Sequence, residues 1–195
     1  MRLPIGSVER LYIHKRSVDA RKKEDIKFVC SVCAEAELRK GNVSYDFLEK
    51  KGIKVYSDEE ITIASSSAPA VPPLVVGFGP AGMFCALLLA RAGFKPIVIE
   101  RGVDIDTRIA DVDRFYKTRS LDVNSNIQFG AGGAGTFSDG KLTTRINDPK
   151  CSYVLRTFYE HGAPEDIMYK AKPHIGTDKL INVVKSIERE ITSLG

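Results

Sequence analysis

The chain has 195 residues, of which 43% are hydrophobic and 28% charged, and its net charge is only +4. This composition is that of a globular protein with room for one domain or two small ones, and so mild a charge does not indicate a nucleic-acid partner. Four cysteines are too few for a disulfide framework, so we expect a cytoplasmic protein.

Residues 1–62 are predicted to form a small α+β domain. Their β-branched and aromatic content predicts strands over residues 7–15 and 26–38 and, after a short helix over 45–51, a further strand over 53–56. The basic stretch over residues 15–23 is typical of a solvated turn. Cys30 and Cys33 lie on one predicted strand and point to opposite faces, so we expect neither a redox pair nor a metal site.

Residues 63–73, rich in serine and proline, are predicted to be a linker. They belong to an uncharged stretch over residues 61–90 that is long enough to suggest a membrane helix. Four prolines and three glycines interrupt that stretch. A buried strand, turn and helix explain it better, and we expect no contact with a membrane.

Residues 74–195 are predicted to be an α/β domain that opens with a Rossmann-like βαβ unit. A strand over 74–76 leads into Gly77-x-Gly79-x-x-Gly82, an apolar helix follows, and a second strand over 97–99 ends at Glu100. In such a unit the glycines allow a tight turn, close approach of a pyrophosphate and close packing of helix on strand. The helix N-terminus attracts the phosphates, and Glu100 can accept hydrogen bonds from ribose hydroxyls. The pattern predicts a dinucleotide site.

A second glycine cluster lies between residues 128 and 145, after a predicted helix over 105–117. Because polar and charged residues follow the glycines, contact with a ligand is favoured over a flexible tether. Helices are predicted over 151–161 and 178–194, with Thr177 as the cap of the second. The residues expected on its buried stripe are Leu180, Val184, Ile187, Ile191 and Leu194. Only two parallel strands are predicted for these helices to pack against, so the domain is expected to be incomplete at its C-terminus.

GFGPAG, the pair Glu100-Arg101 and the run GAGGAGTFSDGKL together resemble the N-terminal part of the bacterial FAD-dependent dehydrogenases. These NAD(P)/FAD-dependent oxidoreductases have a glutathione-reductase-type FAD fold, and the resemblance implies FAD at the first site. It places Glu100 on the adenosine ribose and the segment from Gly133 to Lys141 near the flavin. The implied cofactor contacts are Gly77, Phe78, Gly79, Pro80, Ala81, Gly82, Glu100, Arg101, Arg108, Gly133, Ala134, Gly135, Thr136, Ser138 and Lys141.

The leading hypothesis is a flavoprotein oxidoreductase that acts on a small molecule and holds no metal, with NAD(P)H as a candidate electron donor in a full-length protein. Lys141 and His174 are weak candidates for catalytic residues. The alternative is a fragment that binds FAD or ADP without chemistry, or a module that a partner or a second copy completes. A conventional NAD(P)-dependent dehydrogenase is a third option, which the second glycine cluster disfavours.

Overall fold

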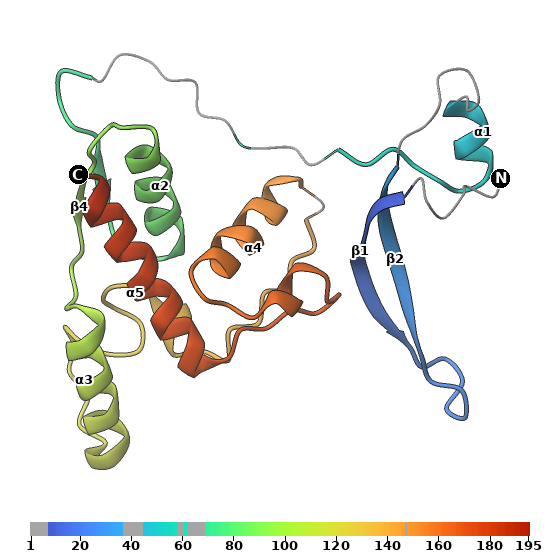
Figure 1. Ribbon diagram of the computed structural model, residues 1–195. Coiled ribbons are helices and arrows are strands. Elements are labelled where there is room, and N and C mark those ends of the chain that lie inside the picture. The colour runs from blue at the N-terminus through green and yellow to red at the C-terminus, as the bar shows by residue number, and fades with distance from the viewer. Residues whose placement is uncertain (1–7, 37–44, 58–60, 62–68, 147) are drawn as a thin grey trace.

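The computed structural model describes residues 8–36, 45–57, 61, 69–146 and 148–195. Its elements in chain order are β1 (Val8–Asp19), β2 (Lys27–Ala36), α1 (Tyr45–Lys50), β3 (Leu74–Val76), α2 (Pro80–Arg91), β4 (Ile97–Ile99), α3 (Ile105–Thr118), the 3-10 helix η2 (Ala134–Phe137), α4 (Lys150–Glu160), the 3-10 helix η3 (Glu165–Met168) and α5 (Thr177–Leu194). The strands form two sheets, β1–β2 and β3–β4 (Figure 1).

The N-terminal sheet is an antiparallel hairpin that lies beside the segment between α4 and α5 (Figure 1). Both predicted strands are confirmed. β1 continues to Asp19, beyond its predicted end, because the basic stretch finds paired positions opposite residues 27–31 of β2. The strand predicted over residues 53–56 is wrong: that segment is described and contains no strand. Strand-forming residues alone do not supply a neighbouring strand to pair with.

The second sheet is a parallel pair joined by a helix. β3 pairs with β4 from Leu74 opposite Ile97 to Val76 opposite Ile99, and α2 runs between the two strands in the chain. Because parallel strands end at the same edge of a sheet, the loop after β3 and the residue after β4 meet there. Residues 63–68 of the predicted linker lie outside the described residues, and residues 69–73 contain no helix or strand.

The core lies between the inner face of β3–β4, helix α2 and helix α5, which packs against α2. α5 buries Leu180, Val183, Val184, Ile187 and Ile191. The predicted stripe is therefore wrong at its end: Leu194 is 42% exposed, and Val183 takes a buried position that was not expected. Thr177 does not cap α5 either, since Gly176 is the N-cap and the Thr177 hydroxyl instead donates to the Ser138 carbonyl at 2.7 Å.

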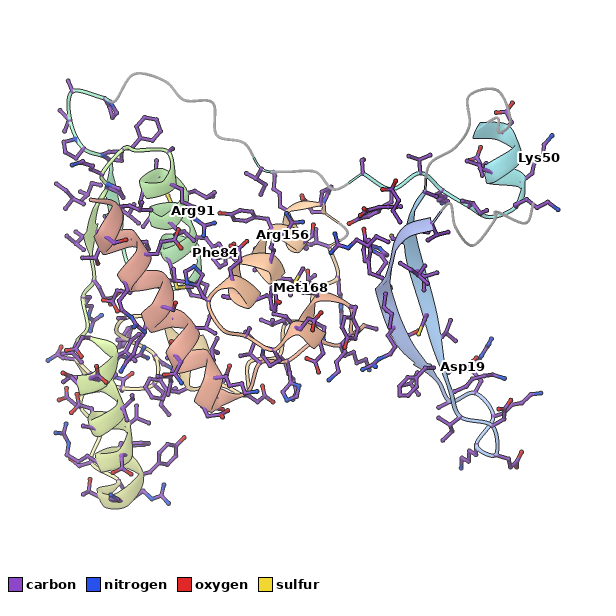
Figure 2. All side chains as sticks on the ribbon, in the orientation of Figure 1. Asp19, Lys50, Phe84, Arg91, Arg156 and Met168 are labelled. Atoms are coloured by element: carbon purple, nitrogen blue, oxygen red, sulfur yellow. The ribbon has the colours of Figure 1, made fainter. Side chains whose placement is uncertain are left out.

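A cluster of polar side chains next to this core joins α2, α4 and α5. Arg91, which points from α2 toward α4 in Figure 2, donates to Glu190 on α5 at 2.6 Å. His161 follows α4 and lies 2.9 Å from a Glu190 oxygen and 2.9 Å from the Ser186 hydroxyl. Burial lowers the pKa of His161, and the nearby Arg91 charge acts in the same direction, while Glu190 and Glu160 oppose it.

All four cysteines, which lie in the described part of the chain, are free thiols. Among the helices described here, none combines the length and the apolar character that crossing a bilayer requires.

Candidate functional site

The loop between β3 and α2 and the first turn of α2 each contain a glycine that the protein's own backbone requires. Gly77 has φ +92°, a conformation that a residue with a side chain rarely adopts. A Cβ atom on Gly82 would lie 1.9 Å from the Gly77 carbonyl oxygen, so glycine at this position lets α2 pack closely against the strand end. These are the turn and packing roles that the motif predicts.

Gly79 is different, because none of the residues that the structure describes requires a glycine at this position. Its φ of −75° and ψ of −178° suit any residue, and a Cβ atom placed on it would meet no atom within 4 Å. The open space lies at the N-terminus of α2, where the N–H groups of Ala81 and Gly82 have no acceptor within the helix. The missing side chain therefore leaves room for a group to approach these amides, as a ligand phosphate would.

Glu100 reaches from the end of β4 to this loop. Its carboxylate accepts from the Phe78 N–H at 2.6 Å and from the Gly102 N–H at 2.8 Å. Burial acts to raise the pKa of this carboxyl, but hydrogen bonds from backbone N–H groups outweigh burial and lower the pKa below its usual range. The site thus holds a fixed negative charge whose remaining lone pairs can accept hydroxyl protons.

Arg101 is exposed at the same edge of the sheet. Its guanidinium lies 4.3 Å from the centre of the Phe129 ring in the second glycine loop, residues 126–138. A cation stacked in this way is held in place while its N–H groups stay at the surface. The structure therefore places Arg101 beside Glu100 on the chain and against the second loop in space.

Arg108 is fully buried on α3 and organises the second glycine loop from beneath. Its guanidinium donates to the carbonyl oxygens of Asn126 (3.2 Å), Ile127 (2.9 Å), Ala131 and Gly133 (3.2 Å). Burial lowers the pKa of Arg108, and the charge of Glu100 opposes this. The contacts of Arg108 are those of a positioning residue inside the protein, and its expected contact with adenosine or phosphate stays a prediction.

The two glycine loops touch. The Gly132 N–H donates to the Phe78 carbonyl at 2.8 Å. A Cβ atom on Gly133 would lie 3.1 Å from both the Gly79 Cα and the Pro80 Cδ. Close backbone contact therefore brings the two predicted halves of the site together into one surface.

The residues that follow in the second loop face in different directions. Ala134 is exposed and Gly135 half-buried, and Gly135, like Gly79, has neither a left-handed backbone nor an atom within 4 Å of an added Cβ. Thr136 is buried, and its hydroxyl faces Gly132, where a Cβ atom would lie 2.2 Å from the Thr136 Oγ1. Of the predicted contacts in this loop, Thr136 is the one whose side chain is turned into the protein.

Ser138 closes the loop, since its hydroxyl donates to the Gly135 carbonyl at 2.7 Å and accepts from the Gly140 N–H at 3.1 Å. Lys141 and His174 lie directly opposite each other in an antiparallel bridge, so their side chains share a face. The Lys141 ammonium contacts the Asp139 carboxylate at 2.7 Å, and this hydrogen bond raises the pKa of Lys141. The two catalytic candidates are neighbours, and both are exposed.

The role of Arg108 within the loop was not anticipated from the sequence, although a signal for it exists. Ile105, Arg108 and Val112 are the buried residues of α3, and their spacing of three and four places them on one stripe. An arginine on the apolar stripe of a short helix must find backbone or side-chain acceptors inside the protein. The carbonyl-rich glycine loop is the acceptor that the sequence offers.

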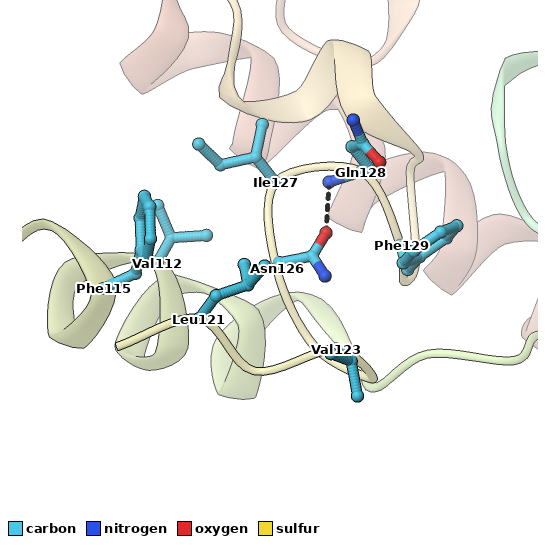
Figure 3. Close-up of a pocket in the computed structure, with 8 residues that line it drawn as sticks. All are labelled: Val112, Phe115, Leu121, Val123, Asn126, Ile127, Gln128 and Phe129. Atoms are coloured by element: carbon cyan, nitrogen blue, oxygen red, sulfur yellow. Dashed lines mark hydrogen bonds between the residues drawn. The ribbon is translucent and has the colours of Figure 1, made fainter. Parts of the chain in front are cut away.

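A separate apolar pocket of about 350 Å³ lies between α3 and residues 121–129 (Figure 3). Val112, Phe115, Leu121, Val123, Ile127 and Phe129 supply most of its walls, with the amides of Asn126 and Gln128 between them. The Asn126 side chain accepts from the Gln128 N–H at 2.8 Å, which holds this turn in shape. The described residues that line the pocket have no ionisable side chain, so they offer apolar contact rather than acid–base groups.

Two comparisons with known proteins bear on this chain. Residues 1–35, which include the hairpin strand β1 and most of β2, match a domain of unknown function (DUF8436). Over 190 residues the chain is 50% identical to an uncharacterized protein of Clostridium beijerinckii, an alignment that covers 96% of this chain and 35% of that protein. The chain therefore spans about a third of the length of the relative that it matches.

Proposed function

We propose that this chain is the FAD-binding part of a flavin-dependent oxidoreductase with a glutathione-reductase-type fold, related to the bacterial FAD-dependent dehydrogenases. The observation that carries the proposal is Gly79: neither its backbone angles nor its surroundings require glycine, and it borders open space at the N-terminus of α2. A pyrophosphate bound in this space would explain why position 79 is a glycine. The parallel strand pair and the ionised Glu100 at the same edge support the same reading.

The proposed contacts follow from the positions of the groups. The amides of Ala81 and Gly82 would hold the diphosphate, and Glu100 would accept from the adenosine ribose. Arg101, kept at the surface by Phe129, would add positive charge beside the ligand. The second loop, which contacts Gly79 through Gly133, would continue the groove toward the flavin end. Bound flavin supplies hydride and electron transfer.

Lys141 and His174 are proposed to act at the flavin end, because they share one face directly after the second loop. The Lys141 ammonium is held by Asp139 and keeps its proton, so its role would be electrostatic: a fixed cation favours negative charge nearby. His174 is the nearer candidate for moving a proton, since an imidazole ring has nitrogens that can accept or donate one. The four free cysteines favour a reducing compartment, and we propose a cytoplasmic location.

A second candidate, a nucleotide-binding part with no chemistry of its own, is favoured by one observation. The outer face of the β3–β4 sheet is exposed: Leu74 is 60%, Val76 75%, Ile97 52% and Ile99 48% accessible. A bare apolar sheet face requires a cover, from a partner or from further chain. Reduction of bound flavin by NADH or NADPH separates the candidates, because only the oxidoreductase carries electrons to it.

The test of the proposal is calorimetric titration of the chain with ADP and with FAD. Gly79→Val should weaken both ligands at least about tenfold, which is about 1.4 kcal/mol, because the new side chain fills the space beside the amides. Gly135→Val is the matched variant in the second loop and should weaken FAD while leaving ADP unchanged. Glu100→Gln should cost about 1–3 kcal/mol for both ligands, since it removes a charged acceptor. Unaltered affinities in Gly79→Val would overturn the proposal.

A further inference from the structure

The hairpin β1–β2 is joined to the rest of the chain along a defined seam. The Arg16 N–H donates to the Tyr169 carbonyl at 2.7 Å, and the Ala171 N–H donates to the Arg16 carbonyl at 2.9 Å. The Arg16 guanidinium lies 5.1 Å from the centres of both the Phe28 ring on β2 and the Tyr169 ring. These contacts fix the hairpin against residues 169–171, so a cleft between the two has walls of settled geometry.

Such a cleft exists beside the seam and has a volume of about 400 Å³, within the range of small-molecule sites. Its floor is apolar and comes from several elements: Leu142, Leu155, Ile167, Met168 and Pro173 line it. Met168, which Figure 2 labels, is the last residue of η3 and lines the cleft. A ligand lying in the cleft would thus bury apolar surface.

The rim of the cleft is cationic. Lys15 comes from β1, Lys170 and Lys172 come from the segment between η3 and α5, and His14, Thr143 and Thr144 complete the polar lining. Among the lining residues that the structure describes, none carries a carboxylate. Lys170 pairs with Asp166 on its own segment. For Lys15 and Lys172, by contrast, the part of the chain that the structure describes supplies neither an ion pair nor a side-chain hydrogen bond.

Two lysines without an ion pair, one from the hairpin and one from the segment before α5, line the cleft together with apolar residues. This combination defines the chemistry of the occupant. We propose that this cleft binds an organic anion with an apolar body, its carboxylate or phosphate between Lys15 and Lys172 and its apolar part on the floor around Met168. A neutral molecule of the same shape would leave both ammonium groups without a partner. An inorganic anion would leave the apolar floor uncovered. The proposal does not depend on a bound flavin.

The probe that tests this is octanoate, titrated into the whole chain by calorimetry, with octyl phosphate, octanol and inorganic phosphate as comparison ligands. We expect octanoate or octyl phosphate to bind at least about tenfold more tightly than octanol, because only they satisfy the two lysines. Whichever of the two binds more tightly identifies the head group. Equal binding of octanol, or no binding of either amphiphilic anion at millimolar concentration, would overturn the proposal.

Variants locate the binding within the molecule, which matters because apolar residues are also exposed on β3 and β4. The double variant Lys15→Gln/Lys172→Gln should weaken the anion about tenfold and leave octanol unchanged. Lys23→Gln, an exposed lysine in the turn of the same hairpin, is the matched control and should bind as the parent does. Amide shifts in the NMR spectrum should concentrate at residues 142–144 and 168–172. Anion binding that the double variant leaves intact would refute this site.

Discussion

Replacing Arg108 by methionine should destabilise the chain, because the guanidinium is what holds the second glycine loop. It donates to four carbonyl oxygens, and two of these contacts, to Asn126 and Gly133, are long at 3.2 Å. A hydrogen bond to a charged group contributes about 1.5–3 kcal/mol, and the release of a buried charge offsets part of the total. Methionine keeps most of the side-chain volume. We therefore expect Arg108→Met to cost about 2–4 kcal/mol.

The control is Arg114→Met on the same helix, whose arginine is 53% exposed and pairs with Asp111 at 3.0 Å. Its expected cost is below about 1 kcal/mol, as for other exposed ion pairs. Urea unfolding followed by the helical circular dichroism signal measures both, since the chain has no tryptophan. Hydrogen exchange should show faster opening at residues 130–133 in Arg108→Met alone. If the two variants unfold within about 0.5 kcal/mol of each other, the carbonyl contacts do not support the loop.

Two further predictions concern packing and pH. Gly82→Ala should lower the free energy of unfolding by about 3 kcal/mol or more, because the new methyl group meets the Gly77 carbonyl oxygen. Gly79→Ala should change it by less than about 0.5 kcal/mol, because its methyl group would enter open space. Equal thermal melts for the two variants would contradict the described packing of α2 on β3. The pKa of His161 is lowered in the folded chain, so the unfolded chain binds this proton more readily. The contribution of His161 to stability should therefore be complete above the usual histidine pKa of about 6.5 and be lost as the pH falls below it. His161→Gln should remove this part of the dependence of unfolding free energy on pH. A parent chain whose unfolding free energy does not change between about pH 7 and 5 would refute this.

Local patterns predicted the βαβ unit well, because the signals that define it are local. A β-branched run, three glycines at fixed spacing and an apolar helix lie within 28 residues, and the structure has β3, α2 and β4 where they were expected. Glu100 directly follows the predicted strand over 97–99 in the sequence, and because parallel strands share an edge it lies beside the loop after β3. The spacing of the glycines in the sequence is therefore sufficient to predict the position of the loop between β3 and α2.

Features that depend on distant contacts were not predictable in the same way. The contact of Gly133 with Gly79 depends on how the chain returns after α3, and no local pattern encodes that path. Threonine often caps helices, but the Thr177 hydroxyl donates its hydrogen bond to the nearby Ser138 carbonyl instead. Leu194 continues the helical stripe in sequence, yet it extends past the surface that α2 covers and stays exposed. In each case tertiary packing overrode a local preference.

The most direct measurement of the central claim is a crystal structure of the chain with ADP. The diphosphate should lie against the N–H groups of Ala81 and Gly82, beside the open face of Gly79, with a ribose hydroxyl on the Glu100 carboxylate. A diphosphate bound elsewhere on the chain, or a Gly79 face that stays empty at saturating ADP, would contradict it.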